Sequence, residues 1–279
     1  MASVISAVRR HPLISFFVLA YLLSWWGWPI YYLNHNAPPI ASFGPFLAAL
    51  VVLAMTLGRS GVTMLFKRMV QWRVKPVWYV VAVGLPIAAT LAATVLNVML
   101  GAPRPSGAAL QHWPSLGPTF LIVLLVPGFG GTWEEPGWRG YALPKLQERH
   151  SALAASGILG ILWAFWHLPL MVVGQIAWSD LVLVVAVTVV LTWVFNGTAG
   201  SVLIAMILHA TNNTVSGSFF SPLFTGSDSV RQSWMLALVW CVVAAVVVAV
   251  TGPAHLSRRR TKQLLSSATR PPSPARRDG

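Results

Sequence analysis

Two adjacent glutamates, two histidines and an asparagine are the residues of this sequence whose types and spacing suit a chemical reaction. They are Glu134, Glu135, His167, His209 and Asn213. Hydrolysis of an amide needs a base that activates water and donors that hold the developing oxyanion. Glu134 and His167 could supply the base, and His209 with Asn213 could supply the donors. A carboxyl group in an apolar cavity has a raised pKa because burial disfavours its charged form, so it can act first as a base and then as an acid.

These residues stand out because they lie within or beside strongly apolar segments. A charged residue at the centre of a membrane helix costs about 2.5–3.5 kcal/mol on insertion scales. Burying a polar side chain costs free energy unless it finds a polar partner. Three helical segments that place their polar side chains in one shared cavity avoid three separate costs of this kind. The remaining histidines and acids fall at chain ends or in expected loops, and we assign them no catalytic role: His11, His35, His112, His150, His255, Glu148, Asp180, Asp228 and Asp278.

The two glutamates differ in the partners that a helix would offer them. Glu135 stands four residues before Arg139 and three after Thr132, spacings typical of an ion pair and of a capping box. Helix initiation is therefore a purely structural alternative for Glu135. Glu134 points about 100° away from Glu135 on a helix and has no Lys or Arg three or four residues later. We therefore expect Glu134 to find its partner on another helix.

Each histidine shares a helical face with another notable side chain. His209 stands four residues before Asn213 and three before Asn212, so an imidazole and a carboxamide lie on one stripe. Trp163 precedes His167 by one turn. Either histidine alone is more often a packing residue, and only the combination with the glutamates favours catalysis. If the helix is distorted, the sequence leaves open whether Asn212 or Asn213 lines the site.

The composition requires that membrane helices position these residues. Of the 279 residues, 56% are hydrophobic and only 9% are charged, whereas soluble domains carry about 25% charged residues. Runs of about 20 apolar residues are long enough to cross a hydrocarbon core as helices. We therefore predict an all-α, polytopic membrane helix bundle with about eight transmembrane helices and an intramembrane polar cavity. The predicted spans are residues 12–33, 40–57, 76–100, 118–130 running into the segment after it, 151–173, 179–196, 199–220 and 233–252.

Lysine and arginine are distributed unevenly among the predicted loops, in a chain whose net charge is +13. Two lie in the N-terminus, five in residues 58–75, three in residues 131–150 and seven after residue 257. Only Arg104 and Arg231 fall on the opposite side, so the positive-inside rule places both termini in the cytoplasm. Because the bases follow membrane topology and form no aromatic-interleaved patch, we expect membrane lipid rather than nucleic acid as a partner.

Several other types of intramembrane hydrolase are disfavoured by their missing signatures. The sequence has no His-Glu-x-x-His helix, no Gly-x-Ser-x-Gly elbow and no pair of aspartates within a predicted span. Its single cysteine, Cys241, lies in an apolar run and is expected to be a core packing residue. One glutamate and two histidines are a legitimate zinc set, so a zinc ion held by Glu134, His167 and His209 is an open alternative.

Three motifs in order on consecutive predicted helices resemble the type II CAAX prenyl endopeptidase and bacteriocin-processing family of glutamate-dependent intramembrane endopeptidases. They are Glu134-Glu135-x-x-x-Arg139, Trp163-x-x-x-His167 and His209-x-x-x-Asn213. The resemblance covers about residues 118–217 and is to the bacterial form. It implies an eight-helix protease in which Glu134 and His167 activate water and His209 and Asn213 form the oxyanion site, without a metal or other cofactor. Trp163 is a departure, because the eukaryotic pattern has phenylalanine there.

We therefore expect an endopeptidase that cleaves a membrane-associated protein or peptide near the cytoplasmic face of a bacterial plasma membrane. One other class is a catalytically silent binding or immunity protein, and another is a transporter, which the absence of a visible internal repeat disfavours. The predicted organisation is a cytoplasmic N-terminus (1–11), N-terminal transmembrane helices (12–117), a catalytic core (118–220), a last transmembrane helix (221–256) and a disordered basic cytoplasmic tail (257–279).

Overall fold

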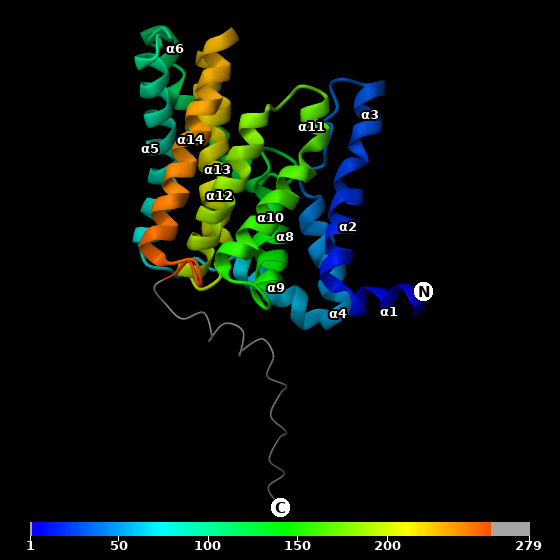
Figure 1. The fold of residues 1–279 in the computed structure, drawn as a ribbon. Helices are drawn as coiled ribbons and strands as arrows, with labels where there is room; N and C mark the ends of the chain where they lie inside the picture. Colours follow the sequence, from blue (N-terminus) through cyan, green and yellow to red (C-terminus); the bar gives the residue numbers. More distant parts are fainter. Residues whose placement is uncertain (1, 258–279) are drawn as a thin grey trace, which may run out of the picture.

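Five helices are long and apolar enough to cross a membrane. The computed structural model describes residues 2–257 and contains helices without strands in that range. Helices of this length and hydropathy are those of an integral membrane protein, so the predicted all-α membrane bundle is confirmed. They are α2 continuing into α3 (Pro12–Trp25 and Gly27–Leu33), α4 (Gly44–Met69), α5 (Val77–Met99), α12 (Trp178–Gly197) and α14 (Gly226–Thr251). In Figure 1, α2 and α4 lie on one side of the bundle and α5, α12 and α14 on the other.

Shorter helical elements fill the spaces between the long helices and connect them. Two of these elements, η3 and η4, are π-helical. In chain order the short elements are α1 (Ala2–Arg10), α6 (Gly107–Leu110), η1 (Trp113–Ser115), α7 (Leu116–Leu125), η2 (Thr132–Glu134), α8 (Glu135–Gly137), η3 (Trp138–Ala142), α9 (Leu143–Gln147), α10 (Ala152–Trp166), α11 (Leu168–Val172), α13 (Val202–Asn212), η4 (Asn213–Phe220) and η5 (Ser221–Leu223).

Three of the eight predicted spans are interrupted, so the count of eight is not confirmed. The span predicted from residue 118 ends at Leu125, before a segment rich in proline and glycine. The span predicted over residues 151–173 breaks at His167, because Pro169 lacks the backbone N–H that would continue the hydrogen bonding of α10. The span predicted over residues 199–220 stays helical but changes from α to π at Asn213.

Helix α4 bends at Gly58, whose φ of +64° is a conformation that glycine adopts readily. The part after the bend lies across one end of the bundle, at the same level as α1 (Figure 1). The sequence predicted a loop over residues 58–75, and this was wrong, because the helix resumes after the glycine and continues to Met69. The described ends of the chain also lie at this end of the bundle. Residues 258–279 of the predicted basic tail lie outside the described part.

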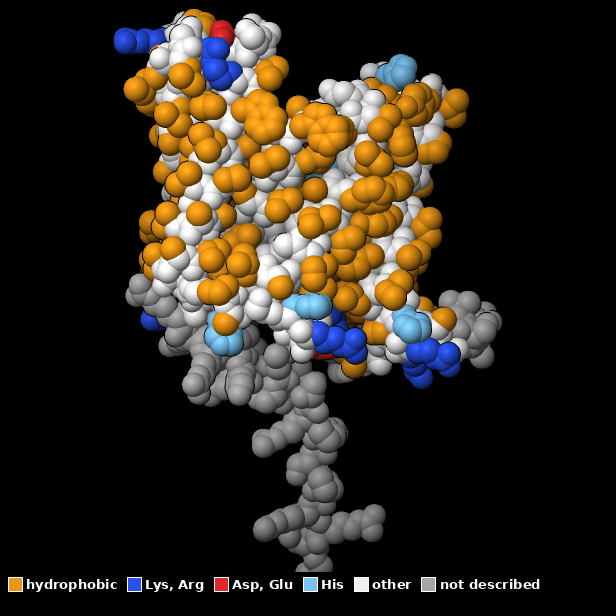
Figure 2. Space-filling view, in the orientation of Figure 1, with side chains coloured by type: hydrophobic (Ala, Val, Ile, Leu, Met, Phe, Trp, Pro, Cys, Tyr) orange, Lys and Arg blue, Asp and Glu red, His pale blue; other side chains and the backbone are white. Residues whose placement is uncertain are grey.

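Hydrophobic side chains cover the outer surface of the bundle between its two ends (Figure 2). Lys and Arg side chains appear at the ends and are absent from the middle of the visible face. This is the distribution of a surface that contacts lipid tails. Cys241 is exposed on α14, so its predicted place in the core was wrong. Periodicity alone could not tell a lipid-facing position from a core position, because both are apolar.

The bundle is held together by close contacts between helices from both halves of the chain. Helix α2 packs on α4, α12 packs on α10 and α14, and α5 packs on α13 and α14. Helices from residues 12–117 and from residues 118–220 share one core. The predicted boundary between these two parts therefore stays a prediction. The tightest approach to the glutamate segment is at Gly137, where a Cβ would lie 2.4 Å from the carbonyl oxygen of Pro45. Only glycine fits this crossing of α8 and α4.

We expect Gly137→Ala to destabilise the protein by about 1–3 kcal/mol, since the added methyl group would force α8 away from the α4 backbone. Gly157→Ala is the matched control, because a Cβ at Gly157 on α10 has no neighbour within 4 Å. Thermal unfolding of both variants in the same detergent measures the difference. Equal midpoints for the two variants would contradict the assigned packing of α8 on α4.

Candidate active site

A tight turn after α7 brings the two glutamates into the bundle. Helix α7 ends at Leu125, and Gly130 and Gly131 follow with φ angles of +64° and +79°. Residues with a Cβ are strained in this left-handed conformation, whereas glycine is not. Elements η2 and α8 begin directly after the turn and pack against α4 and α13. Glu134 and Glu135 therefore sit on short helical segments between α4 and α13.

Glu134 is 3% exposed, and two indoles hold one of its carboxylate oxygens. Nε1 of Trp163, on α10, donates a hydrogen bond to Oε2 at 2.6 Å, and Nε1 of Trp138 donates to the same oxygen at 3.3 Å. The predicted partner of Glu134 on another helix is therefore confirmed, and it is Trp163. Because both donors engage Oε2, the second oxygen, Oε1, is left to meet water or substrate.

Glu135 is the centre of a buried charge cluster. Its Oε1 accepts hydrogen bonds from Nη1 of Arg139 at 3.1 Å and from Nδ1 of His209 at 2.8 Å. Arg139 is fully buried, with its guanidinium 4.3 Å from the ring centroid of Trp163 and its Nη2 donating to Oγ1 of Thr188 at 3.3 Å. The predicted contact between Glu135 and Arg139 is confirmed. The cluster ties together α8, η3, α10, α12 and α13.

The capping box predicted as an alternative role for Glu135 does not form. Thr132 makes no capping hydrogen bond, and its buried hydroxyl has no partner within residues 2–257. The contact with Glu135 instead orients the ring of His209. Because Nδ1 donates its proton to the carboxylate, Nε2 is the nitrogen that remains available to a substrate.

Polar atoms from three elements converge on Gly131. A methyl group placed on Gly131 would lie 2.7 Å from Oε1 of Glu134, 3.2 Å from Nε2 of His209 and 3.5 Å from Nδ2 of Asn213. A proton acceptor and two potential donors thus lie close together beside the backbone of Gly131. Glycine is needed here, because a Cβ would collide with Oε1 of Glu134.

Asn213 lies where the α-helical α13 becomes the π-helical η4, and its amide is held from both sides. Its Nδ2 donates to the carbonyl oxygen of Gly130 at 2.5 Å, and its Oδ1 accepts from Nδ2 of Asn212 at 3.2 Å. One Nδ2 hydrogen is therefore engaged and the other is free. The side chain of Asn213, rather than that of Asn212, approaches Gly131, as the spacing from His209 predicted.

His167 lies at the break between α10 and α11, and Trp163 contacts both His167 and Glu134. Its Nδ1 donates to the carbonyl oxygen of Trp163 at 2.8 Å, which leaves Nε2 as the acceptor of the neutral ring. In the described part of the chain no hydrogen bond or ion pair joins His167 to Glu134, so the water that they are expected to share stays a prediction. Trp163 connects them, since its indole contacts Glu134 and its backbone contacts His167.

Four residues of the site were not predicted from the sequence: Trp138, Thr188, Gly130 and Gly131. Trp138 stands four residues after Glu134, the same spacing that identified Arg139 as the partner of Glu135. A search limited to Lys and Arg missed the indole N–H as a donor at that position. The glycine pair directly before the glutamates was also a readable signal, because consecutive glycines mark backbone that side chains would obstruct.

A metal ion has no ready coordination shell in this arrangement. Among residues 2–257 no group of three or more His, Cys, Asp and Glu side chains is placed to hold one. Within the alternative zinc set, one oxygen of Glu134 accepts two indole hydrogen bonds, and Nδ1 of both His167 and His209 is engaged. The atoms left free, Oε1 of Glu134 and Nε2 of both histidines, are not grouped to hold an ion in the described residues, so zinc binding would require these side chains to move together.

The comparisons with known proteins concern the same region of the chain. Residues 115–215 match the family described as Type II CAAX prenyl endopeptidase Rce1-like. A protein of Methanococcus maripaludis named CAAX prenyl protease 2 is 29% identical over 142 residues, which are 45% of this chain and 52% of that protein. The chain thus matches about half the length of this relative. The matched residues run from α7 into η4 and include the two glutamates and both histidines. Residues 115–215 of this chain are therefore similar to the Rce1-like type II CAAX prenyl endopeptidases.

Proposed function

We propose that this protein is an intramembrane endopeptidase that hydrolyses a peptide bond of a membrane-associated protein or peptide. The observation that carries the proposal is the convergence of Glu134 Oε1, His209 Nε2 and Asn213 Nδ2 beside Gly131. These three groups are the acceptor and the donors that amide hydrolysis needs. The family of the matched residues and the name of the Methanococcus relative support a protease.

In the proposed reaction Glu134 activates a water molecule next to its Oε1. Oε1 accepts a proton from the water, and the resulting hydroxide attacks the carbonyl carbon of the scissile bond. The indoles of Trp138 and Trp163 keep the carboxylate in one orientation through Oε2. The protonated Glu134 then gives its proton to the leaving nitrogen, so the products are a carboxylate and an amine. His167 assists as the second acceptor near the water.

Asn213 and His209 are proposed to hold the negative charge that forms on the carbonyl oxygen. Asn213 offers its free Nδ2 hydrogen, while its other hydrogen stays on Gly130. His209 donates from Nε2 when its ring is protonated, and Glu135 stabilises that imidazolium through Nδ1. Arg139 balances the charge of Glu135, so its role is to position Glu135 and His209 rather than to contact substrate.

The proposed orientation places both termini and the bent half of α4 on the cytoplasmic side of a bacterial plasma membrane. The described chain ends lie at one end of the bundle in Figure 1, together with Arg59, Lys67 and Arg68 after the bend. Basic residues at one end of a membrane bundle mark its cytoplasmic side. Substrate would reach the buried site from the membrane, because the groups that act on it lie between helices.

A direct assay measures new peptide termini. Purified protein in liposomes is incubated with membrane proteins from a strain that lacks it, and mass spectrometry identifies the N-termini that appear. Glu134→Gln should lower the cleavage rate by about 10²–10⁴, because the amide keeps the size of the side chain but cannot accept the proton of water. Glu148→Gln, which changes an exposed acid on the surface, should keep the wild-type rate. No cleavage by the wild type, or full cleavage by Glu134→Gln, would refute the proposal.

Gly131→Ala should abolish cleavage, because its methyl group would lie 2.7 Å from Oε1 of Glu134 and would displace the proposed base. The matched control is Gly174→Ala, since Gly174 has a φ of +75° and a Cβ added there would have no neighbour within 4 Å. Both variants carry the same kind of backbone strain, but only the first obstructs the site. Comparison of their cleavage rates and unfolding midpoints separates obstruction from strain, and similar rates would contradict the assigned water position.

Cleavage should continue after prolonged incubation with a strong chelator, because the proposed reaction uses Glu134 as the base without a metal-bound water. Elemental analysis of the same sample measures whether metal was removed. If activity were lost and zinc alone restored it, the zinc-dependent alternative with Glu134, His167 and His209 would replace this mechanism.

A further inference from the structure

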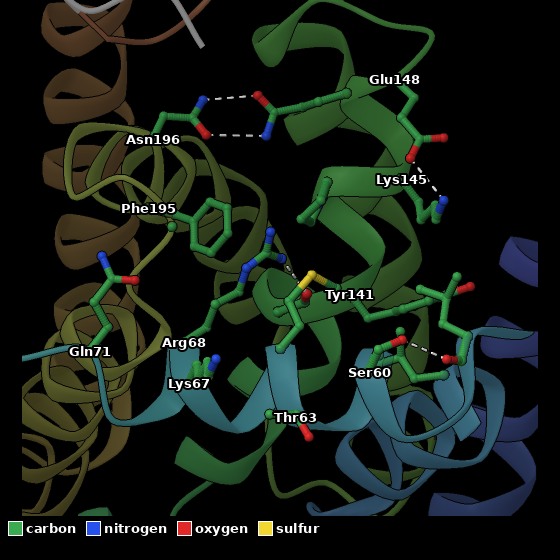
Figure 3. Close-up of a pocket in the computed structure, with 18 of the residues that line it drawn as sticks. Ser60, Thr63, Lys67, Arg68, Gln71, Tyr141, Lys145, Glu148, Phe195 and Asn196 are labelled. Carbon is green, nitrogen blue, oxygen red and sulfur yellow. Dashed lines mark hydrogen bonds and ion pairs between the residues drawn. The ribbon is translucent and has the colours of Figure 1, made fainter. Parts of the chain in front are cut away.

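A cavity of about 850 Å³ lies at the end of the bundle where α4 bends, apart from the groups assigned to catalysis. One wall is α4, on both sides of the bend at Gly58, and the facing wall is formed by η3 and α9. Figure 3 shows Lys67 and Arg68 on the bent half of α4, opposite Lys145 and Glu148. The volume falls in the range of roughly 300–1,000 Å³ that is usual for small-molecule sites.

The charged side chains of this cavity are mostly basic, and most of the basic ones lack an acidic partner. Arg59, Lys67, Arg68 and Lys145 line it, with Glu148 as the one acid. Glu148 is already paired with Lys145 at 2.8 Å. Within residues 2–257 no acid forms an ion pair with any of the other three bases. The cavity therefore offers uncompensated positive charge to an anion.

The cavity is apolar on one side and basic on the other. The upright half of α4 contributes Leu53 and Leu57, and Leu57 is 50% exposed. The half of α4 that lies across the end of the bundle contributes the basic side chains, at the level of α1 in Figure 1. A phospholipid has this same order, with acyl chains toward the bilayer core and a phosphate at the surface.

A buried hydroxyl without a partner lies in the wall of the cavity. Tyr141 lines it and is 3% exposed, and its hydroxyl makes no hydrogen bond within the described chain. A buried hydroxyl that stays unpaired costs about 1–3 kcal/mol, which a ligand oxygen would recover. We do not assign Arg68 to the ligand, because its Nη1 already donates a hydrogen bond to the carbonyl oxygen of Gly140 at 2.9 Å.

We propose that this cavity binds an anionic phospholipid, with the phosphate between Arg59, Lys67 and Tyr141 and the acyl chains along Leu53 and Leu57. Basic pockets between membrane helices bind such headgroups because positive charge and apolar walls meet at the membrane surface. The C-terminal residues of the chain do not suit this site, since residues 258–279 carry seven Lys and Arg and a single acid. The proposal is independent of the proteolytic function.

Native mass spectrometry of the detergent-purified protein tests this proposal without a proteolysis assay. The protein is titrated with phosphatidylglycerol, with phosphatidylcholine of the same acyl chains, and with glycerol 3-phosphate as a free phosphate compound. We expect a retained phosphatidylglycerol molecule, little phosphatidylcholine, and no displacement by glycerol 3-phosphate. Equal retention of both lipids would overturn the proposal, as would displacement by glycerol 3-phosphate or by a soluble acidic peptide.

Two variants locate the binding site. Arg59→Gln combined with Lys67→Gln should weaken phosphatidylglycerol binding by at least about tenfold, and Tyr141→Phe should weaken it by a smaller factor while keeping the shape of the cavity. Arg10→Gln combined with Arg149→Gln is the control, because it removes two exposed charges outside the cavity. Wild-type affinity in both cavity variants, or an equal loss in the control, would refute the assignment. Unfolding midpoints of all variants verify that they are folded.

Discussion

The buried charge of Glu135 is the constraint on which the rest of the site depends. A carboxylate taken out of water costs several kcal/mol unless charges and hydrogen bonds compensate it. Arg139 and His209 supply that compensation on the same oxygen, and Arg139 is supported in turn by Thr188 and by the face of Trp163. Because these partners come from separate helices, satisfying one charge fixes the relative positions of the segments that carry the reacting groups.

The groups of the proposed reaction, and Arg139 that positions them, lie where regular helices are interrupted. Glu134 follows the glycine turn after α7, His167 lies between α10 and α11, Arg139 is in a π-helical segment, and Asn213 begins another. Irregular backbone inside a membrane is tolerated where it is buried in protein, and π-helical turns are frequent at functional sites. Residues 134–143 of this irregular backbone are buried by the surrounding helices, whereas residues 125–130 before the glutamates are exposed.

Much of the fold class and of the site could be predicted from the sequence. The length of each apolar run and the polar residues within or beside these runs can both be read from the sequence. The spacing of Glu135 and Arg139 and that of His209 and Asn213 correspond to contacts or a shared space in the structure. The bend of α4 and the helix breaks were not predicted, because apolar runs conceal where backbone geometry changes. The roles of Trp138 and Gly131 depend on distances between helices, which sequence spacing does not contain.

Trp163 makes three contacts at once, and this has a consequence for relatives with phenylalanine at that position. Its indole N–H binds Glu134, its ring face lies against Arg139, and its carbonyl oxygen accepts from His167. Phenylalanine would retain the ring face and the carbonyl but would lose the N–H. Oε2 of the glutamate would then need a different donor. Aromatic identity at this position thus sets how the carboxylate is anchored, and two aromatic residues of similar size are not interchangeable without a compensating change nearby.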